Sequence, residues 1–159
     1  MSIEWWILIV VYILTTCLIF FIPRSKVRLA IVAFLFKQVI TFLTGIVVVE
    51  IGLLAYPVRE FATVIRSSFL YEYYAFPVVC ALFNVWYPEK KNTFVQFNYY
   101  FWVTTVLTLI EIVIEKYTAL LDYIYWEWYV TWITVCITFY WTRLFCLWFF
   151  EKGRFTSEM

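Results

Sequence analysis

The chain has 159 residues, of which 65% are hydrophobic, 25% are aromatic and only 14% are charged, and its formal net charge is +1. Soluble domains are about half apolar and about a quarter charged, so this composition excludes a water-soluble globule and predicts a membrane protein with the lipid bilayer as its main partner. There is no basic excess to hold a nucleic acid, and the absence of histidine removes the commonest zinc ligand and general base.

Five apolar runs are long enough to form membrane-spanning helices, because about 20 residues cross the hydrocarbon core. They are residues 5–22, 30–56, 67–87, 95–119 and 128–150. The connections between them leave no room for another domain. We therefore predict an all-α fold for residues 1–159, an integral membrane bundle of five transmembrane helices with no soluble domain. The first run is expected to stay in the mature protein, because Glu4 stands where a signal peptide is basic.

The second run carries Lys37, Gln38 and Glu50 within its apolar sequence. Helical spacing puts Glu50 on one face and a stripe of small residues on roughly the opposite face. Small residues allow helices to approach closely, so we expect this stripe to serve packing and attach no chemistry to it. Its members are Thr41, Gly45 and Gly52.

The third run is preceded by residues 57–68, in which apolar and polar positions, the latter including Arg59 and Arg66, alternate at helical spacing. This segment is either an interfacial amphipathic turn or the solvated start of the third helix, and we slightly favour the second. Within the run, Glu72 adds a carboxylate. Pro77 cannot donate a helical hydrogen bond, so it predicts a kink that frees the carbonyl of Tyr73.

The fourth run has a polar face at spacings of four and three residues, formed by Thr104, Thr108, Glu111, Glu115, Thr118 and Asp122. The opposite side, expected to face lipid, holds Leu109, Val113, Ile114 and Leu120. The fifth run carries Arg143 and a matching line of threonines, Thr131, Thr134, Thr138 and Thr142. The short connection makes these two helices antiparallel neighbours, so we predict that Glu111 faces Thr134 or Thr138. Alternatively, each threonine bonds its own backbone four residues back.

Basic residues in the short loops indicate the orientation in the membrane. One side receives Arg24, Lys26, Arg28, Lys90, Lys91, Lys152 and Arg154; the other receives Arg59, Arg66 and Lys116. This asymmetry predicts an N-terminus outside the cell and a cytoplasmic C-terminus. Tryptophans near the ends of the runs, Trp126 among them, are expected to mark the interfaces.

An unpaired charge inside a bilayer costs about 2.5–3.5 kcal/mol on insertion scales, so these polar groups must pair, become neutral or line water. The candidate network comprises Glu50, Glu72, Glu111, Glu115, Lys37, Gln38, Arg59, Arg66, Arg143, Thr108, Thr134 and Thr138. In one interpretation, Arg59, Arg66 and Lys116 neutralise the carboxylates and fix the register of the helices. In the other, the carboxylates line a cavity open to the outside that attracts cations or protons.

Several stretches of the chain together carry a resemblance to a known family: "FKQVIT", "GIVVVE", "YPVREF", "EYYAFPVVC", "EKYT" and "YIYWEWYVTWIT". They resemble an uncharacterised family of small five-span membrane proteins of spore-forming Gram-positive bacteria. The resemblance covers nearly the whole chain and implies a bacterial cytoplasmic membrane. The family has no assigned activity, so no functional residue follows from it.

The residues support three classes of function unequally. An enzyme is disfavoured, because no catalytic motif is present and only a carboxylate pair drawn from Glu50, Glu72 and Glu111 offers acid–base chemistry. We expect no cofactor or metal, and we interpret Cys17, Cys80, Cys136 and Cys146 as small buried hydrophobes. The leading hypothesis is a structural or accessory component that binds a membrane protein partner or a second copy of itself. The alternative is a proton- or cation-conducting transporter or channel, assembled as an oligomer.

Overall fold

The computed structural model describes the backbone of residues 3–157 and the side chains of residues 3–151. The basic side chains of Lys152 and Arg154, used above for orientation, lie outside the described side chains. The elements in chain order are α1 (Ile3–Ile19), the 3₁₀ turn η1 (Arg24–Lys26), α2 (Val27–Glu50), β1 (Leu54–Ala55), the π-helical turn η2 (Leu70–Ala75), α3 (Phe76–Val85), α4 (Thr93–Tyr117), β2 (Asp122–Tyr123) and α5 (Trp128–Ser157). The predicted helical class is confirmed for this part of the chain.

Within residues 3–157, three helices are long and apolar enough to cross a membrane: Arg24–Glu50, Thr93–Tyr117 and Trp128–Glu151. Two further apolar helices, Ile3–Ile19 and Leu70–Val85, are shorter. All five helices overlap the predicted runs, but the second predicted run, 30–56, extends beyond the end of its helix. Its helix ends at Glu50, and Gly52, with φ of 76°, turns the chain into β1. Glycine adopts this left-handed conformation without the steric cost that a Cβ would bring.

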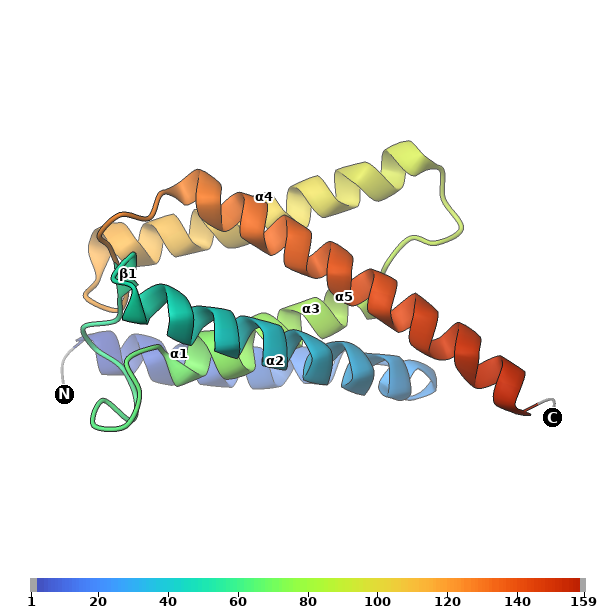
Figure 1. Ribbon diagram of the computed structural model, residues 1–159, viewed down its shortest axis with the longest axis horizontal. Helices are drawn as coiled ribbons and strands as arrows, with labels where there is room; N and C mark the ends of the chain where they lie inside the picture. The colour runs from blue at the N-terminus through green and yellow to red at the C-terminus, as the bar shows by residue number, and fades with distance from the viewer. Residues whose placement is uncertain (1–2, 158–159) are drawn as a thin grey trace.

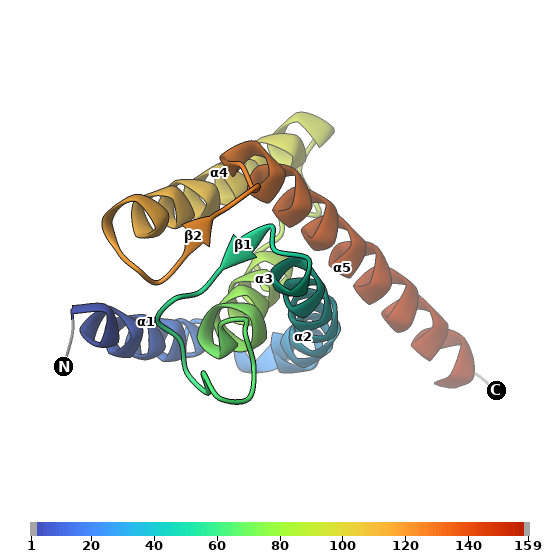
Figure 2. The ribbon, with the colours of Figure 1, turned by 60° about the vertical axis from the view of Figure 1, so that its left-hand side comes forward.

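The helices form two layers (Figures 1 and 2). In one, α2 packs against η2 and α3, and α1 packs against the same two elements. In the other, α4 lies beside α5, and α5 also crosses α2. The N-terminus is at the same end as the β1 segment, and the C-terminus is at the opposite end (Figure 1).

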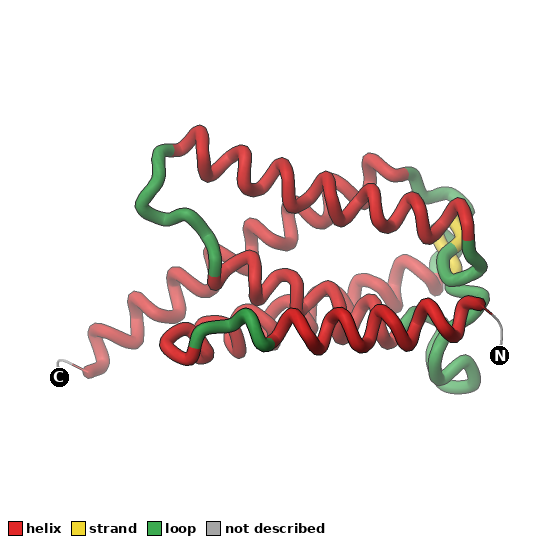
Figure 3. The backbone as a smooth tube through the Cα atoms, turned by 180° about the vertical axis from the view of Figure 1, so that it is seen from behind, coloured by secondary structure: helices red, strands yellow, loops and turns green. Residues whose placement is uncertain are grey.

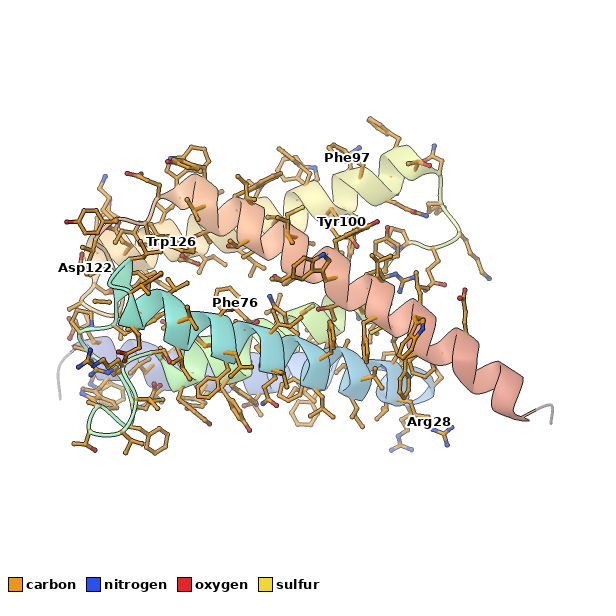
Figure 4. All side chains as sticks on the ribbon, viewed as in Figure 1. Arg28, Phe76, Phe97, Tyr100, Asp122 and Trp126 are labelled. Carbon is orange, nitrogen blue, oxygen red and sulfur yellow. The ribbon has the colours of Figure 1, made fainter. Side chains whose placement is uncertain are left out.

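The two ends of the bundle are closed differently. At the end we call the strand end, β1 and β2 form an antiparallel pair in which Leu54 is opposite Tyr123 and Ala55 is opposite Asp122. The loops that flank both strands gather there (Figure 3). At the aromatic end, which holds the 86–92 loop, the rings of Phe83, Tyr87, Tyr99, Tyr100 and Phe139 pack together. Asp122 and Trp126 lie at the strand end, and Arg28 lies at the other (Figure 4).

Residues 57–68 form turns rather than a helix, and the third helical segment begins after them. The slightly favoured prediction, a solvated start of the third helix, is therefore wrong. Arg59 explains the difference, because its guanidinium donates hydrogen bonds to the carbonyls of Tyr56, Ala62 and Ile65. These bonds hold the segment as a compact loop.

Pro77 lies at the beginning of α3, directly after the π-helical turn. The kink itself stays a prediction, but the carbonyl of Tyr73 accepts a hydrogen bond from Nε2 of Gln38, at 3.0 Å. A π-helical turn rearranges the backbone hydrogen bonds at a point where the α-helical pattern is interrupted. Gln38, one of the predicted polar residues of the second run, thereby ties α2 to η2.

Two burial predictions fail. Leu109 and Val113 are exposed on α4 as expected, but Ile114 packs into the core and Leu120 is fully buried, since α4 ends at Tyr117 and the chain folds back over the bundle. Cys17 is exposed, in contrast to the buried Cys80 and Cys146.

Candidate functional site

A cavity of about 260 Å³ lies between the two layers of helices. We call it the polar cavity, because its lining includes Lys37, Thr41, Glu72, Glu111 and Thr138. These side chains come from α2, η2, α4 and α5, so all but one of the principal helices contribute to it. Trp126 and Leu54 from the strand end also line it, which places the paired strands across one end of this space.

Glu72 reaches the polar cavity from the π-helical turn and is 9% exposed. Its Oε1 accepts a hydrogen bond from the hydroxyl of Tyr56 at 2.6 Å. Its carboxylate lies against Gly45 of α2: a Cβ at that glycine would be 2.9 Å from Cδ and 3.2 Å from Oε2 of Glu72. The glycine that the sequence suggested only for helix packing therefore makes room for a carboxylate.

Glu111 enters the cavity from α4, and its Oε1 accepts two hydrogen bonds. One comes from the hydroxyl of Tyr123 at 2.6 Å and the other from Oγ1 of Thr131 at 2.7 Å. The predicted partners Thr134 and Thr138 are wrong, although both line the same cavity. The reason is that β2 folds back beneath α4 and meets the first turn of α5, so Glu111 lies level with the beginning of that helix.

The remaining threonines of α5 follow the alternative prediction. Thr134, Thr138 and Thr142 each donate to the carbonyl four residues earlier, at 2.8 Å in every case. Thr108 of α4 does the same with Thr104, at 2.9 Å. Since these hydroxyls donate within their own helices, Thr134 and Thr138, the two that line the cavity, offer it no free donors.

Lys37 is the only basic residue among the described lining of the polar cavity, and it is 3% exposed. Its Nζ donates to Oγ1 of Thr138 at 2.5 Å and lies 5.1 Å from the centre of the Phe139 ring. An ammonium over an aromatic face is stabilised by the quadrupole of the ring. Lys37 is thus held on the α5 side of the cavity.

The predicted neutralisation of the buried carboxylates by Arg59, Arg66 and Lys116 is wrong for Glu72 and Glu111. Among the described side chains, ion pairs join Arg66 to Glu50 at 3.4 Å and Arg143 to Glu89. Arg59 is occupied by backbone carbonyls, and Lys116 lies near the ring of Tyr117. The described hydrogen bonds to Glu72 and Glu111 therefore come from hydroxyl groups, and neither carboxylate forms an ion pair with these three basic residues.

Seven of the twelve predicted members of the network are not in the lining of the polar cavity, among them Arg143, Glu50 and Glu115. Arg143 is buried at the aromatic end, where it pairs with Glu89 and lies 4.4 Å from the centre of the Tyr87 ring. Glu50 is exposed beside Arg66. Glu115 is partly buried near Tyr123; burial first, and then the carboxylates of Glu111 and Glu115, raise the pKa of the Tyr123 hydroxyl.

One hydroxyl in the polar cavity is not satisfied. Thr41 is 8% exposed, and its Oγ1 has no hydrogen-bond partner among the described residues. An unpaired buried hydroxyl costs about 1–3 kcal/mol of stability. A ligand atom that formed a hydrogen bond with this hydroxyl would remove that cost.

A second, mostly apolar cavity of about 160 Å³ adjoins the first. We call it the apolar cavity; it lies between α1, α3 and α4, with Val11, Val79 and Ile110 in its lining. The two cavities share Tyr56, Phe76 and Glu111. Phe76 lies in the middle of the bundle (Figure 4), so Glu111 stands where the polar and apolar spaces meet.

Sequence reasoning missed both tyrosines that hold the carboxylates, and it placed Trp126 at a membrane interface. In the structure Nε1 of Trp126 donates to Oγ1 of Thr131 at 2.8 Å, behind the hydrogen bond to Glu111. Tyr123 lies between two predicted helices and Tyr56 is the last residue of the second predicted run, 30–56, which extends beyond the real helix end at Glu50, so helical spacing indicates the direction of neither side chain. Their signal was chemical: each is a hydroxyl donor in a short connection next to a run with a buried carboxylate.

No family model, curated protein or solved structure matches this chain. The described residues also contain no group of three or more acidic or cysteine side chains placed to hold a metal ion.

Proposed function

We propose that the chain is an integral protein of the bacterial cytoplasmic membrane in which all five apolar helices are embedded. Three of them are long enough to span the bilayer on length and composition alone. The two shorter ones pack directly against α2 or each other, which supports a common environment. The more basic connections, 24–28 and 86–92, lie at the aromatic end, and this asymmetry supports placing that end in the cytoplasm.

We further propose that the protein binds a monovalent cation, with the proton as the smallest case, in the polar cavity and carries it through the membrane. The observation behind this proposal is a charge imbalance. Two carboxylates, Glu72 and Glu111, share the cavity with one ammonium, Lys37. If all three are ionised, one negative charge remains without a counter-ion. One bound proton or monovalent cation removes the imbalance, and the low dielectric of the bundle makes that removal strongly favourable.

A purely structural network would be arranged differently. Buried charges that only fix helix register are stabilised by close opposite charges, because an unpaired buried charge is costly. Arg143 and Glu89 follow that rule at the aromatic end. In the polar cavity the donors to the carboxylates are neutral, so the charge of the site can change when a cation enters or leaves.

The strand end is suited to control access to the site. Tyr123 belongs to β2 and Tyr56 directly follows β1, so each strand segment contributes the hydroxyl that holds one carboxylate. When a cation binds the carboxylates, it competes with these hydroxyls for the negative charge, so both attachments of the strand pair to the bundle weaken. We propose that the pair opens at that point and connects the cavity with the outside.

The test is cation flux in proteoliposomes. With a potassium diffusion potential as the driving force, an internal pH-sensitive dye reports proton entry, and external sodium or methylammonium is then tested in the same vesicles. We expect Glu111→Gln and Glu72→Gln to reduce the flux at least about tenfold, because each removes the negative charge and preserves shape. The matched control is Glu50→Gln, an exposed glutamate on α2, which should leave the flux unchanged.

Two results would contradict the proposal. One is a wild-type flux no greater than that of empty vesicles. The other is an undiminished flux in a folded Glu72→Gln, Glu111→Gln double variant, since the pathway would then not pass the carboxylates.

A partner-binding role is a second candidate, supported by the C-terminal part of α5. The end of α5 extends past the other helices (Figure 1). Just before it, where Phe145 still stacks on Phe36 of α2, the apolar side chains Leu144, Leu147 and Phe149 are between 42% and 46% exposed. A helix that leaves its own bundle offers a face to a second copy. Mass measurement of the protein in lipid nanodiscs tests this: a dimer or larger assembly supports it, and a monomer at all protein concentrations contradicts it.

A further inference from the structure

We infer that the ligand of the two joined cavities is an organic amine: an ammonium group in the polar cavity, carrying a short apolar or aromatic substituent in the apolar cavity. This inference rests on the proposed cation-binding function and specifies its substrate class. It follows from the hydrogen-bond acceptors, the aromatic lining and the shape of the site.

The acceptors suit an ammonium group. The described hydrogen bonds to Glu72 and Glu111 all end at Oε1, which leaves Oε2 of each carboxylate for a ligand. Oε2 of Glu72 lies on the Gly45 side of α2, one helical turn from Thr41. A protonated amine has up to three N–H donors and no acceptor, and Thr41, whose hydroxyl has no partner among the described residues, lines the same cavity as a third acceptor.

The site is poor for an inorganic cation. Sodium, potassium and divalent ions require several oxygen ligands at close range, but most backbone carbonyls of this region are used within helices. No group of three acidic or cysteine ligands occurs among the described residues. Three rings in the lining of the polar cavity, Tyr56, Phe76 and Trp126, are instead the partners that stabilise an organic ammonium through cation–π contacts.

The apolar cavity supplies the second half of the recognition. Its volume of about 160 Å³ is close to the roughly 150 Å³ of an apolar protein cavity that holds one benzene molecule. Because Glu111 and Phe76 line both cavities, an amine whose nitrogen lies beside Glu111 directs its substituent into the apolar space. Ile110, 52% exposed on α4, lies at the margin of that space, so such a ligand can reach the site from the lipid between α1 and α4.

The experiment measures binding of three probes to the purified full-length protein in nanodiscs by isothermal titration calorimetry. Benzylammonium has both groups, methylammonium has only the charge, and benzyl alcohol has only the ring. We expect benzylammonium to bind at least about tenfold more tightly than either of the others, a difference that corresponds to about one ring buried in apolar surroundings. Empty nanodiscs give the contribution from partitioning into lipid, which is subtracted.

Variants of the lining residues identify which contacts hold the ligand. Thr41→Val removes the unpartnered hydroxyl at constant shape and should weaken benzylammonium binding about fivefold, while Thr41→Ser should restore it. Val79→Phe fills the apolar cavity and should reduce the preference for benzylammonium over methylammonium to about twofold, with methylammonium binding unchanged. Glu50→Gln should alter neither affinity.

The outcomes separate the two proposals. If methylammonium binds as tightly as benzylammonium and both depend on Glu111, the apolar cavity does not recognise a substituent, so the inference is overturned and cation binding stands. If none of the cations binds above empty nanodiscs, both are overturned. If benzyl alcohol binds as well as benzylammonium, the carboxylates do not select the ligand and the inference fails.

Discussion

At the aromatic end of the bundle, Arg143 is held by the carboxylate of Glu89 and the ring of Tyr87, whereas toward the strand end the described hydrogen bonds to Glu72 and Glu111 come from hydroxyl groups. Both regions bury ionisable side chains in an apolar molecule. They differ in what surrounds the charge: a fixed opposite charge in the first region, and neutral donors beside a cavity in the second.

This difference separates structural charge from exchangeable charge. A buried ion pair with a dedicated counter-ion gains nothing from binding another ion, so it holds helices in place. A carboxylate held by a tyrosine hydroxyl can give that donor up when a cation arrives, and the tyrosine can turn to water. The variants below should therefore affect stability mainly at the aromatic end and binding mainly at the polar cavity.

The largest loss of stability is expected from Phe139→Ala. Phe139 is fully buried, packs on Phe83 in the aromatic cluster and lies under the ammonium of Lys37. Removing a buried ring leaves a cavity and typically costs about 3–5 kcal/mol. Equilibrium unfolding of the protein in mixed micelles measures the change, with the exposed Phe97→Ala of α4 as the control. A cost below about 1 kcal/mol would show that the aromatic cluster does not carry the stability of this end.

The sequence could predict the positions of the helices but not the site between them. Apolar length and helical spacing located all five helical segments, and they placed Glu111 on the face that meets α5. They could not show that a π-helical turn aims Glu72 at Gly45, since a local change of helical period is not visible in a hydropathy pattern. The strand pair could not be predicted either, because two strands of two residues each show almost no periodicity. The roles of Tyr56 and Tyr123, which depend on that pair, could therefore not be predicted.

Neutralising one carboxylate at each end tests the comparison directly. Glu89→Gln leaves the buried guanidinium of Arg143 without its counter-ion, so we expect a loss of about 1–2 kcal/mol; the value is moderate because Glu89 is 58% exposed and water can take its place. Glu111→Gln removes an uncompensated negative charge, so stability should change by less than about 0.5 kcal/mol or rise. Unfolding of both variants in the same micelles gives the answer. Equal losses would mean that Glu111 is neutralised in a fixed way, as Arg143 is.

The tyrosine that holds Glu72 should make stability depend on alkaline pH. Burial, followed by the charge of Glu72, raises the pKa of Tyr56 well above its usual value of 10.0. In the unfolded chain the phenol ionises near pH 10 and favours unfolding, while in the fold it stays protonated. Its full contribution is therefore present below pH 10 and is lost as the pH rises above that value, by about 1.4 kcal/mol per pH unit.

Tyr56→Phe removes both the hydrogen bond and the titration. We expect it to cost about 1–2 kcal/mol at pH 7, since the hydroxyl donates to a carboxylate, and the gap to the wild type should narrow between pH 10 and pH 11. Unfolding free energies measured at intervals from pH 7 to pH 11 test this, with Tyr125→Phe, whose side chain is 80% exposed, as the control. A gap that stays constant over this range would contradict the buried, protonated state of Tyr56.

Gly45→Ala is expected to cost about 1 kcal/mol, less than the loss expected from Phe139→Ala. The new Cβ would lie 2.9 Å from Cδ of Glu72, so the carboxylate must move away from α2. Gly52→Ala should cost a similar amount for another reason, because nothing lies near its Cβ position but its φ is 76°. Measuring both substitutions in the Glu72→Ala variant distinguishes the steric cause from the backbone cause. In that variant the stability cost of Gly45→Ala should vanish, while the cost of Gly52→Ala should persist. Because Gly45→Ala displaces the carboxylate without altering any charge, it should lower the free energy of cation binding by more than it lowers the free energy of unfolding. Equal losses in binding and in stability would mean that the position of Glu72 against α2 is unimportant for the site.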